Sequence, residues 1–295
     1  MNNEMVSVLM PVFNGEKFLI DSVRSILDQT YKNLELIIID DGSTDNSLKI
    51  IRKLAKDDSR IKFYSQKNMG IIASLNRALS LSNGNYIARM DSDDFSIDTR
   101  IENQLKFLKK NKLDICGGHC EIFDENGMLN SIGIVPLSHI TCKLSLFFKV
   151  PFFHPSVLIK KSFLEKNNLR YGQSSYRKIE DLDLWIRMFK CGAKFGNIDR
   201  VVLRYRLTNG SLSKINNRQI KIETRQILSD FISDPSASFN KIVNELPQKL
   251  NSEEKSLVVR YIWYSFKRLN FRNFKLLKDI DNKIILRTIL SEILR

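Results

Sequence analysis

Long apolar runs are missing from this 295-residue chain. No window approaches the roughly 18 consecutive apolar residues that a membrane-spanning helix needs. The first residues, Met1-Asn2-Asn3-Glu4, lack the basic flank of a signal peptide. We therefore expect a cytoplasmic protein. The 43% hydrophobic and 27% charged content is ordinary for a globular chain, which excludes a disordered one.

Paired cysteine motifs are missing as well. The four cysteines, Cys116, Cys120, Cys142 and Cys191, are scattered without the spacing of a disulfide framework or a finger-type zinc site. We expect reduced thiols. The segment Cys116-Gly117-Gly118-His119-Cys120 does gather three potential metal ligands, but a glycine-containing edge strand is the interpretation that we favour.

Two common nucleotide-binding motifs are also absent. No Gly-x-Gly-x-x-Gly follows the first predicted strand and no Gly-Lys-Ser/Thr occurs, so neither a dinucleotide-binding fold nor a P-loop is supported. The chain has neither an RNA-binding signature nor zinc-finger spacing, so we expect no nucleic-acid partner.

Alternating elements characterise the first 115 residues. Short β-branched runs alternate with segments of helical spacing, a pattern typical of βαβ units around a largely parallel sheet. The predicted strands are Val6–Phe13, Leu34–Ile39, Ile61–Tyr64 and a run that begins at Tyr86. The second of these is continuously apolar, as expected of a strand covered on both faces.

The alternation breaks down in the second half. Strands are predicted over Pro151–Ile159 and Phe195–Tyr205, a hairpin turn over 124–127, and a helix over Asp181–Cys191. The predicted fold class is therefore α/β, with a nucleotide-binding sheet that becomes mixed toward its second half. We predict a domain over 1–213 and a basic α-helical appendage over 214–295.

Three carboxylates, Asp91, Asp93 and Asp94, follow the strand that begins at Tyr86. Crowded carboxylates repel one another, so the pattern favours a site for a hard divalent cation or for ligand hydroxyls. For an isolated motif of this kind, a solvated acidic turn is the better explanation. Here three further polar loops accompany it.

Those loops span 11–16, 40–43 and 66–70, each directly after a predicted strand. In open α/β sheets, ligands bind at the carboxyl ends of the strands, so we expect all four loops to meet at one edge. A diphosphate can lie beside carboxylates only if a divalent cation lies between them. The sequence therefore predicts an acidic, metal-dependent nucleotide site.

Six motifs occur in a characteristic order: Pro-Val-Phe-Asn-Gly-Glu at 11–16, Ser-Ile-Leu-Asp-Gln-Thr-Tyr at 25–31, Asp-Asp-Gly-Ser-Thr-Asp at 40–45, Asn-x-Gly at 68–70, Gly-Asn-Tyr-Ile at 84–87 and Asp-Ser-Asp-Asp at 91–94. In this order they resemble the family 2 glycosyltransferases of the GT-A fold, over roughly residues 5–213. Six ordered motifs are far more specific than any one of them.

The resemblance implies a nucleotide-sugar site. Pro11, Phe13 and Asn14 would line the base pocket, Glu16 would help to hold that loop, and Asp41 would accept a hydrogen bond from uracil. Read without the resemblance, Asn14 is equally a turn residue and Asp41 a helix cap.

The same resemblance implies metal binding. Asn68 would belong to the nucleotide-sugar site, and Asp91 would face the ribose or the metal. Asp93 would be the principal protein ligand of Mn²⁺ or Mg²⁺, with Asp94 in support. Arg206 begins a segment similar to the family's closing segment, where a basic residue meets the diphosphate.

The segment around Glu180 and Asp181 resembles the one in which the family places its catalytic base. Asp181 would take the proton from an acceptor hydroxyl as that oxygen attacks the anomeric carbon opposite the diphosphate, which inverts the configuration. Glu180 would orient the site or contact the acceptor. His154 has two interpretations, a residue beside the acceptor or phosphate and a structural histidine.

These implications define the expected function. It is an inverting, metal-dependent transfer of a hexosyl or N-acetylhexosaminyl group from a UDP-sugar donor to a hydroxyl of a growing surface glycan, such as O-antigen, capsule or a teichoic-type polymer. The acceptor would be a glycan, in some pathways lipid-linked. Two alternatives are a non-catalytic nucleotide-binding scaffold, against which the intact Asp93 and Asp181 argue, and a nucleotidyltransferase, for which the loop at 14–17 is a poor match.

Basic charge gathers in the C-terminal region. Residues 214–295 hold 16 Lys and Arg against 9 Asp and Glu, so this region carries a net +7 of the chain's +14. Its apolar stripe is more typical of a region that packs on its own domain. Basic surfaces also attract anionic lipid headgroups, so the alternative is peripheral contact with the inner face of the plasma membrane.

We expect deletion of 214–295 to reduce sedimentation with anionic liposomes, because each Lys or Arg near the headgroups contributes about 1 kcal/mol. Neutral liposomes are the control. Unchanged sedimentation of the shortened protein would contradict the prediction.

Overall fold

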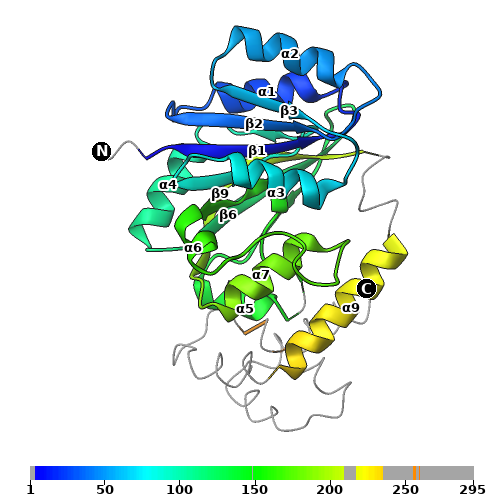
Figure 1. Cartoon of the computed structure of the whole chain (residues 1–295). Helices are drawn as coiled ribbons and strands as arrows, with labels where there is room; N and C mark the ends of the chain where they lie inside the picture. Colours follow the sequence, from blue (N-terminus) through cyan, green and yellow to red (C-terminus); the bar gives the residue numbers. More distant parts are fainter. Residues whose placement is uncertain (1–3, 148, 209–216, 235–254, 257–258, 260–295) are drawn as a thin grey trace.

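A computed structural model describes residues 4–147, 149–208, 217–234, 255–256 and 259 (Figure 1). The strands in this part of the chain form one nine-stranded sheet in the order β3-β2-β1-β4-β8-β6-β9-β5, with β7 paired to β6. Most of the C-terminal region predicted over 214–295 lies outside the described residues.

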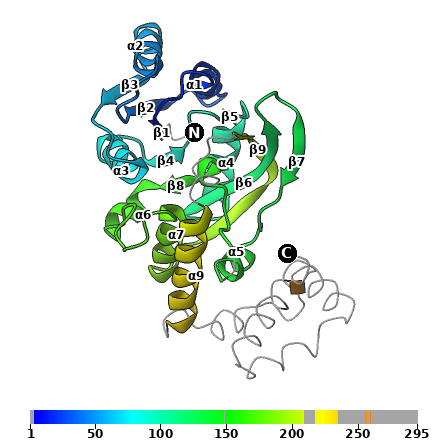
Figure 2. The ribbon, with the colours of Figure 1, turned by 90° about the vertical axis from the view of Figure 1, so that its right-hand side faces the viewer.

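The first half of the sheet is parallel. Its strands are β1 (Val6–Val12), β2 (Leu34–Asp40), β3 (Ile61–Ser65) and β4 (Tyr86–Arg89). The helices α1 (Leu19–Leu27), α2 (Ser47–Asp57) and α3 (Ile71–Leu81) connect them. Parallel pairing of β1 with both β2 and β4 places their carboxyl ends at one edge. Figure 2 views the molecule from the side toward which these strands run.

The second half of the sheet is mixed, as predicted. Its strands are β5 (Phe95–Ser96), β6 (Ile115–Asp124), β7 (Leu129–Gly133), β8 (Leu158–Lys160) and β9 (Phe195–Leu207). β8 runs antiparallel to both β4 and β6, whereas β6 and β9 pair in parallel. β5 then pairs with the end of β9, which brings the segment after the acidic loop against the far edge of the sheet.

Both faces of the sheet are covered, which explains the continuous apolar run of β2. Leu9, Ile37 and Ile39 face one apolar cluster, and Val8, Met10 and Leu36 face the other. Alternate residues of a strand point to opposite faces, so each strand feeds both clusters. The remaining helices are α4 (Arg100–Lys110), α5 (His139–Ser145), the 3₁₀ turn η1 (His154–Ser156), α6 (Lys161–Lys166), α7 (Glu180–Lys190) and α9 (Asn217–Ser233).

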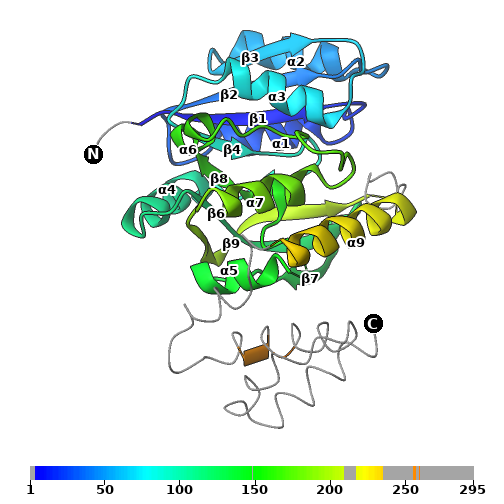
Figure 3. The same cartoon turned by 60° about the horizontal axis from the view of Figure 1, so that its bottom comes forward.

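Helix α9, the described start of the C-terminal region, packs against α7 (Figure 3). The rings of Phe189 and Phe231 lie 5.3 Å apart. Glu223 accepts a hydrogen bond from the backbone N–H of Lys178 at 2.8 Å. None of the helices in the described part of the chain combines the length and apolar character that a bilayer crossing requires.

Two local predictions were wrong. Most of Pro151–Ile159 is not a strand, because Pro155 lacks a backbone donor and Ser156 instead closes the η1 turn onto Phe153. Cys116–Cys120 lies in β6, an inner strand of the sheet, which pairs with β9 along this segment, with β8 at Cys116 and with β7 at Cys120. Its glycine at 117 is required by close packing, since a Cβ there would lie 2.6 Å from Oδ1 of Asn197.

Glu35 ties the other end of the parallel strands together. Its buried carboxylate accepts hydrogen bonds from Ser7 Oγ at 2.6 Å, the Asn83 backbone N–H at 2.7 Å and Lys62 Nζ at 2.6 Å. Burial by itself would raise the pKa of Glu35, but these hydrogen bonds outweigh it and lower the pKa below its usual value. The ionised form is therefore part of the folded structure.

We expect Glu35→Gln to lower the free energy of unfolding by about 1–3 kcal/mol at pH 7, because buried donors lose a charged acceptor. A carboxylate with a lowered folded-state pKa stabilises the protein above the unfolded-state pKa and loses this effect as the pH falls through the folded-state pKa. The difference from wild type should therefore shrink below about pH 4. Urea unfolding of both proteins at pH 7 and at pH 3.5 measures this difference in the free energy of unfolding.

Glu165→Gln is the matched control, because that carboxylate is 62% exposed in its pair with Lys161. Its effect should be within about 0.5 kcal/mol of zero. A loss for Glu35→Gln that is equal at pH 7 and pH 3.5 would contradict the charge argument.

Candidate active site

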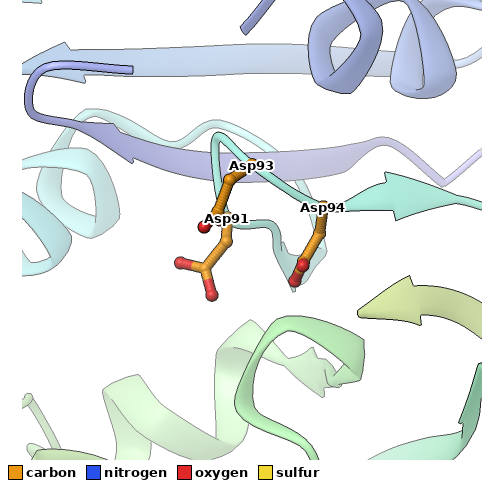
Figure 4. Close-up of side chains that lie close together, drawn as sticks. All are labelled: Asp91, Asp93 and Asp94. Atoms are coloured by element: carbon orange, nitrogen blue, oxygen red, sulfur yellow. The ribbon is translucent and has the colours of Figure 1, made fainter. Parts of the chain in front are cut away.

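The acidic loop follows β4 directly and brings the three predicted carboxylates together. One oxygen from each of Asp91, Asp93 and Asp94 lies within 4.8 Å of the others. Figure 4 shows the three side chains projecting from this loop. Asp94 is 1% exposed, and its Oδ1 accepts a hydrogen bond from the backbone N–H of Arg206 at 2.8 Å.

Burial and mutual repulsion make this loop hold protons more tightly than free carboxylates do. Burial, together with the charge of Asp91, raises the pKa of Asp93 to about 6. The pKa of Asp94 lies well above its usual value, because of burial and then the charges of Asp91 and Asp93. A bound cation would favour the ionised forms of Asp93 and Asp94.

The loop fits a divalent cation. Oδ2 of Asp94 is buried without a hydrogen-bond partner among the described residues. Three carboxylates supply the hard oxygen donors that Mg²⁺ and Mn²⁺ prefer. Asp91 and Asp93, the predicted ligands, are partly exposed, whereas Asp94 is buried.

Arg206 lies beside this loop, near the end of β9. Its Nε donates a hydrogen bond to the backbone oxygen of Asp93 at 2.8 Å. Its guanidinium stacks over Phe18 at 3.9 Å and Phe123 at 4.4 Å from the ring centroids. The structure thus places the predicted diphosphate-binding residue at the acidic loop.

The loops after β1 and β2 bind each other. Asn14, which has φ 51°, accepts a hydrogen bond from the backbone N–H of Thr44 at 2.8 Å. Glu16 accepts two from Asn46, from its backbone and its side chain, both at 2.8 Å. A Cβ on Gly15 would lie 3.1 Å from Oγ of Ser92, so the β1 loop also abuts the acidic loop.

Asp41 joins a third loop to this edge. Its carboxylate accepts hydrogen bonds from Gln66 Nε2 at 2.7 Å and from the backbone N–H groups of Met69 and Gly70 at 2.9 and 2.8 Å. A carboxylate has about four acceptor positions, so one remains for a base N–H. Asn68, in the same loop, is exposed.

Phe13 presents an exposed aromatic ring at the end of β1, where that strand is bonded to the backbone of Asp41. The Asp41 backbone N–H donates to the oxygen of Val12, the residue before Phe13, at 2.8 Å. Phe13 is 51% exposed, and Pro11 is half-buried in the same strand end. An apolar ring beside a polar acceptor is an arrangement suited to a planar base.

Glu180 and Asp181 occupy the first turn of α7, where the helix dipole favours carboxylates. Burial and then the charge of Asp181 raise the pKa of Glu180 to about 7. Burial also raises the pKa of Asp181, against the opposing effect of a hydrogen bond from the Leu182 backbone N–H. Raised pKa values make stronger bases.

His154 is buried behind this pair. Its Nε2 lies 3.2 Å from the Tyr171 hydroxyl, and its Nδ1 lies 3.8 Å from Oε1 of Glu180. Burial, followed by the charge of Arg89, lowers the pKa of His154 well below its usual value, so the ring is neutral at physiological pH. His154 thus lies beside Glu180 on the interior side of the candidate base pair of carboxylates.

Sequence reasoning missed Arg89 and Tyr171. Arg89 forms an ion pair with Asp91 and is 3% exposed. Its signal was a lone arginine at the end of an otherwise apolar strand, two residues before Asp91. Tyr171 had no signal, because only the fold brings residue 171 to His154.

We expect the protein to bind Mn²⁺ more tightly at pH 7 than at pH 5. The pKa of Asp93 is about 6, so protons compete with the cation below that pH and binding near pH 6 releases protons. Calorimetric titration with MnCl₂ at pH 5, 6 and 7, in two buffers of different ionisation enthalpy, measures both effects.

Asp93→Asn should weaken Mn²⁺ binding at least about 10- to 100-fold, the range seen even for loss of outer-shell partners. Asp199→Asn is the matched control, because that carboxylate is 79% exposed on β9. Binding that is equal at all three pH values, or that survives Asp93→Asn, would contradict this site.

Comparison with known proteins places this geometry in context. The chain is 33% identical over 214 residues to the O-antigen biosynthesis glycosyltransferase WbnJ of Escherichia coli, covering 72% of this chain and 83% of WbnJ. It is 37% identical over 206 residues to EpsE of Bacillus subtilis, named as a glycosyltransferase, covering 68% of this chain and 72% of EpsE.

Solved structures show the same fold. The S. aureus TarS 1-349 complex with UDP-GlcNAc superposes with a TM-score of 0.60 at 16% identity, covering 96% of this chain and 79% of TarS 1-349. The fold is therefore GT-A, as the motif order implied. The profile described as "Glycosyl transferase family 2" matches residues 7–167. From these motifs, this fold and these relatives, the chain belongs to glycosyltransferase family 2.

Proposed function

We propose that this protein transfers a hexosyl or N-acetylhexosaminyl group from a UDP-sugar to a hydroxyl of a growing cell-surface glycan, with inversion and with a divalent cation. One observation carries the proposal. The acidic loop after β4 and the carboxylates of α7 are close enough for the charge of Asp91 to raise the pKa values of both Glu180 and Asp181. This proximity supports a cation site on the phosphate side and a base on the acceptor side of one reaction centre.

The donor end is supported by the loops after β1, β2 and β3. Phe13 offers an exposed ring to the base, and Asp41 retains an acceptor position beside it. TarS was solved with UDP-GlcNAc, whereas a Pyrobaculum calidifontis mannosyltransferase of TM-score 0.57 and 12% identity, covering 98% of this chain and 86% of that enzyme, was solved with GDP-Man and Mn²⁺. UDP is our choice because Asp41 suits the uracil N–H.

The leaving group is accommodated at the acidic loop. Asp91 and Asp93 would hold Mn²⁺ or Mg²⁺, which when bound neutralises charge on the departing diphosphate. Arg206 keeps its guanidinium beside the Asp93 backbone, where it adds positive charge on the same side. Asp94 holds the loop to β9 through the Arg206 backbone N–H.

A carboxylate of α7 removes the proton of the acceptor hydroxyl. Asp181 takes the proton of the acceptor hydroxyl as the oxygen attacks the anomeric carbon, and the bond to the diphosphate breaks on the opposite face. Burial raises the pKa of Asp181, which strengthens it as a base. Glu180, backed by His154, orients the acceptor.

The acceptor assignment draws on WbnJ, whose name places it in O-antigen biosynthesis. A surface glycan is the corresponding acceptor here, with a lipid-linked form supplied at the membrane. We assign transfer to residues 1–213 and contact with the inner membrane surface to the basic region 214–295, which would make the enzyme cytoplasmic and peripheral.

We expect one UDP-sugar from a panel to release UDP in the presence of Mn²⁺ and a glycan acceptor. Asp93→Ala and Asp181→Asn should each lower kcat at least about 100-fold, as expected for loss of a cation ligand or a general base. Asp199→Asn should retain wild-type turnover. A luminescent UDP assay with long incubation measures all four proteins.

Turnover that survives Asp181→Asn would reject that residue as the base. Absence of turnover with every donor, together with UDP binding that is indifferent to Mn²⁺, would replace the transferase proposal with a non-catalytic scaffold.

A further inference from the structure

The side-chain amide of Gln66 lies between an arginine of α3 and the carboxylate proposed to bind the base. Gln66 comes directly after β3. Its Nε2 donates a hydrogen bond to Oδ1 of Asp41 at 2.7 Å, and its Oε1 accepts one from Nη1 of Arg77 at 2.9 Å. Gln66 thus connects α3 to the loop after β2.

The chemistry of these two neighbours fixes the orientation of the amide. A guanidinium only donates hydrogen bonds, and an ionised carboxylate only accepts them. The amide oxygen therefore faces Arg77, and the amide nitrogen faces Asp41. Ser74, one turn before Arg77 on α3, accepts a second hydrogen bond from Nε2 at 3.1 Å through its Oγ. Both N–H groups of the amide are thus used.

Arg77 is itself held by the end of β3. Its Nη1 also donates to the backbone oxygen of Ser65 at 3.2 Å. Its guanidinium lies 5.6 Å from the ring centroid of Tyr64. These contacts keep Arg77 in the place from which it orients the amide of Gln66.

The hydrogen bonds of Asp41 are divided unevenly between its two oxygens. Oδ1 accepts from Gln66 and from the backbone N–H of Met69. Among the described residues, Oδ2 accepts from the backbone N–H of Gly70 alone. A carboxylate has about four acceptor positions, two on each oxygen. Oδ1 is therefore full, and Oδ2 keeps one position.

This division distinguishes between bases. Uracil presents a single ring N–H, at N3, whereas the corresponding edge of guanine presents two neighbouring donors, N1–H and the N2 amino group. Guanine pairs with a carboxylate through both oxygens, and Oδ1 of Asp41 has no position left for its second donor. Asp41 is 4% exposed, and an unpaired donor in such a buried contact lowers affinity.

We propose that Gln66 and Arg77 are positioning residues that set the base specificity of the donor site. Gln66 fills Oδ1 of Asp41, Arg77 holds Gln66 in that orientation, and the carboxylate then reads one N–H, which favours UDP over GDP. The proposal rests on the proposed function for the place of the base. It needs no turnover, because the affinities of UDP and GDP are measured without transfer.

Calorimetric titration of the whole protein with UDP and with GDP, each with Mn²⁺, tests the proposal. The two nucleotides share ribose and diphosphate, so the ratio of their affinities isolates the base. Wild type should bind UDP at least about 10-fold more tightly than GDP. Gln66→Ala returns a position to Oδ1, while Met69 and Gly70 still hold the carboxylate. The affinity for GDP should therefore rise, and the UDP-to-GDP ratio should fall at least about 10-fold.

Substitutions of Arg77 separate orientation from mere presence of the amide. Arg77→Met leaves the amide of Gln66 free to turn, so the UDP-to-GDP ratio should lie between those of wild type and Gln66→Ala. Arg77→Lys keeps a donor for Oε1 and should retain most of the preference. Arg52→Met is the matched control, because Arg52 is exposed on α2, and both affinities should stay at the wild-type value.

The outcomes separate this proposal from damage to the loop and from the transfer reaction. Equal wild-type affinities for UDP and GDP, or binding of neither, would overturn it. An unchanged ratio in Gln66→Ala would also overturn it, including one in which both affinities fall in parallel. A wild type with the expected ratio that releases UDP from none of the UDP-sugars would reject transfer alone.

Discussion

Like-charge repulsion at one edge of the sheet is the constraint on which the candidate site depends. Asp91, Asp93 and Asp94 leave β4 within a few residues of one another, and the first turn of α7 adds two more carboxylates. Such a concentration costs free energy unless positive charge offsets it. Arg89 provides part of that charge from inside the protein, and the proposed cation would provide the rest from solvent.

The sheet explains how these groups meet. Four parallel strands end together, and backbone pairing of β1 with β4 sets their loops side by side. The antiparallel strand β8 then follows η1, which carries His154 to the back of α7. Segments separated by about ninety residues therefore converge, as loops at the carboxyl ends of strands do in open α/β sheets.

Local pattern was sufficient for the parallel half and insufficient for the mixed half. Strands β1, β2 and β4 are buried along almost their whole length, so their apolar runs were sufficient to predict them. Residues 151–157 form a loop and a 3₁₀ turn, because Pro155 interrupts strand pairing. The ring of Phe152 packs instead against Trp185, and that of Phe153 against Tyr205. Asp183 of α7 is buried in an ion pair with Arg187 at 2.6 Å, which the local sequence pattern does not predict.

For the site, the ordered motifs identified carboxylates that the fold gathers, whereas Arg89 and Tyr171 emerged only from the fold. The sequence does not show which residue pairs with an arginine in an apolar strand. The partner of Tyr171, His154, lies seventeen residues away in the chain. The assigned roles in base, metal and acceptor binding remain predictions.

The bond from Glu223 of α9 to the backbone of Lys178 has a mechanical consequence. Lys178 lies two residues before Glu180. Helix α9 is therefore hydrogen-bonded to the loop that leads into the candidate base. A second hydrogen bond, from the Tyr176 hydroxyl to Asp230 of α9, lies two residues earlier in the same loop. A displacement of α9, for example when a partner binds to it, would therefore be transmitted directly to the segment that precedes Glu180 and Asp181.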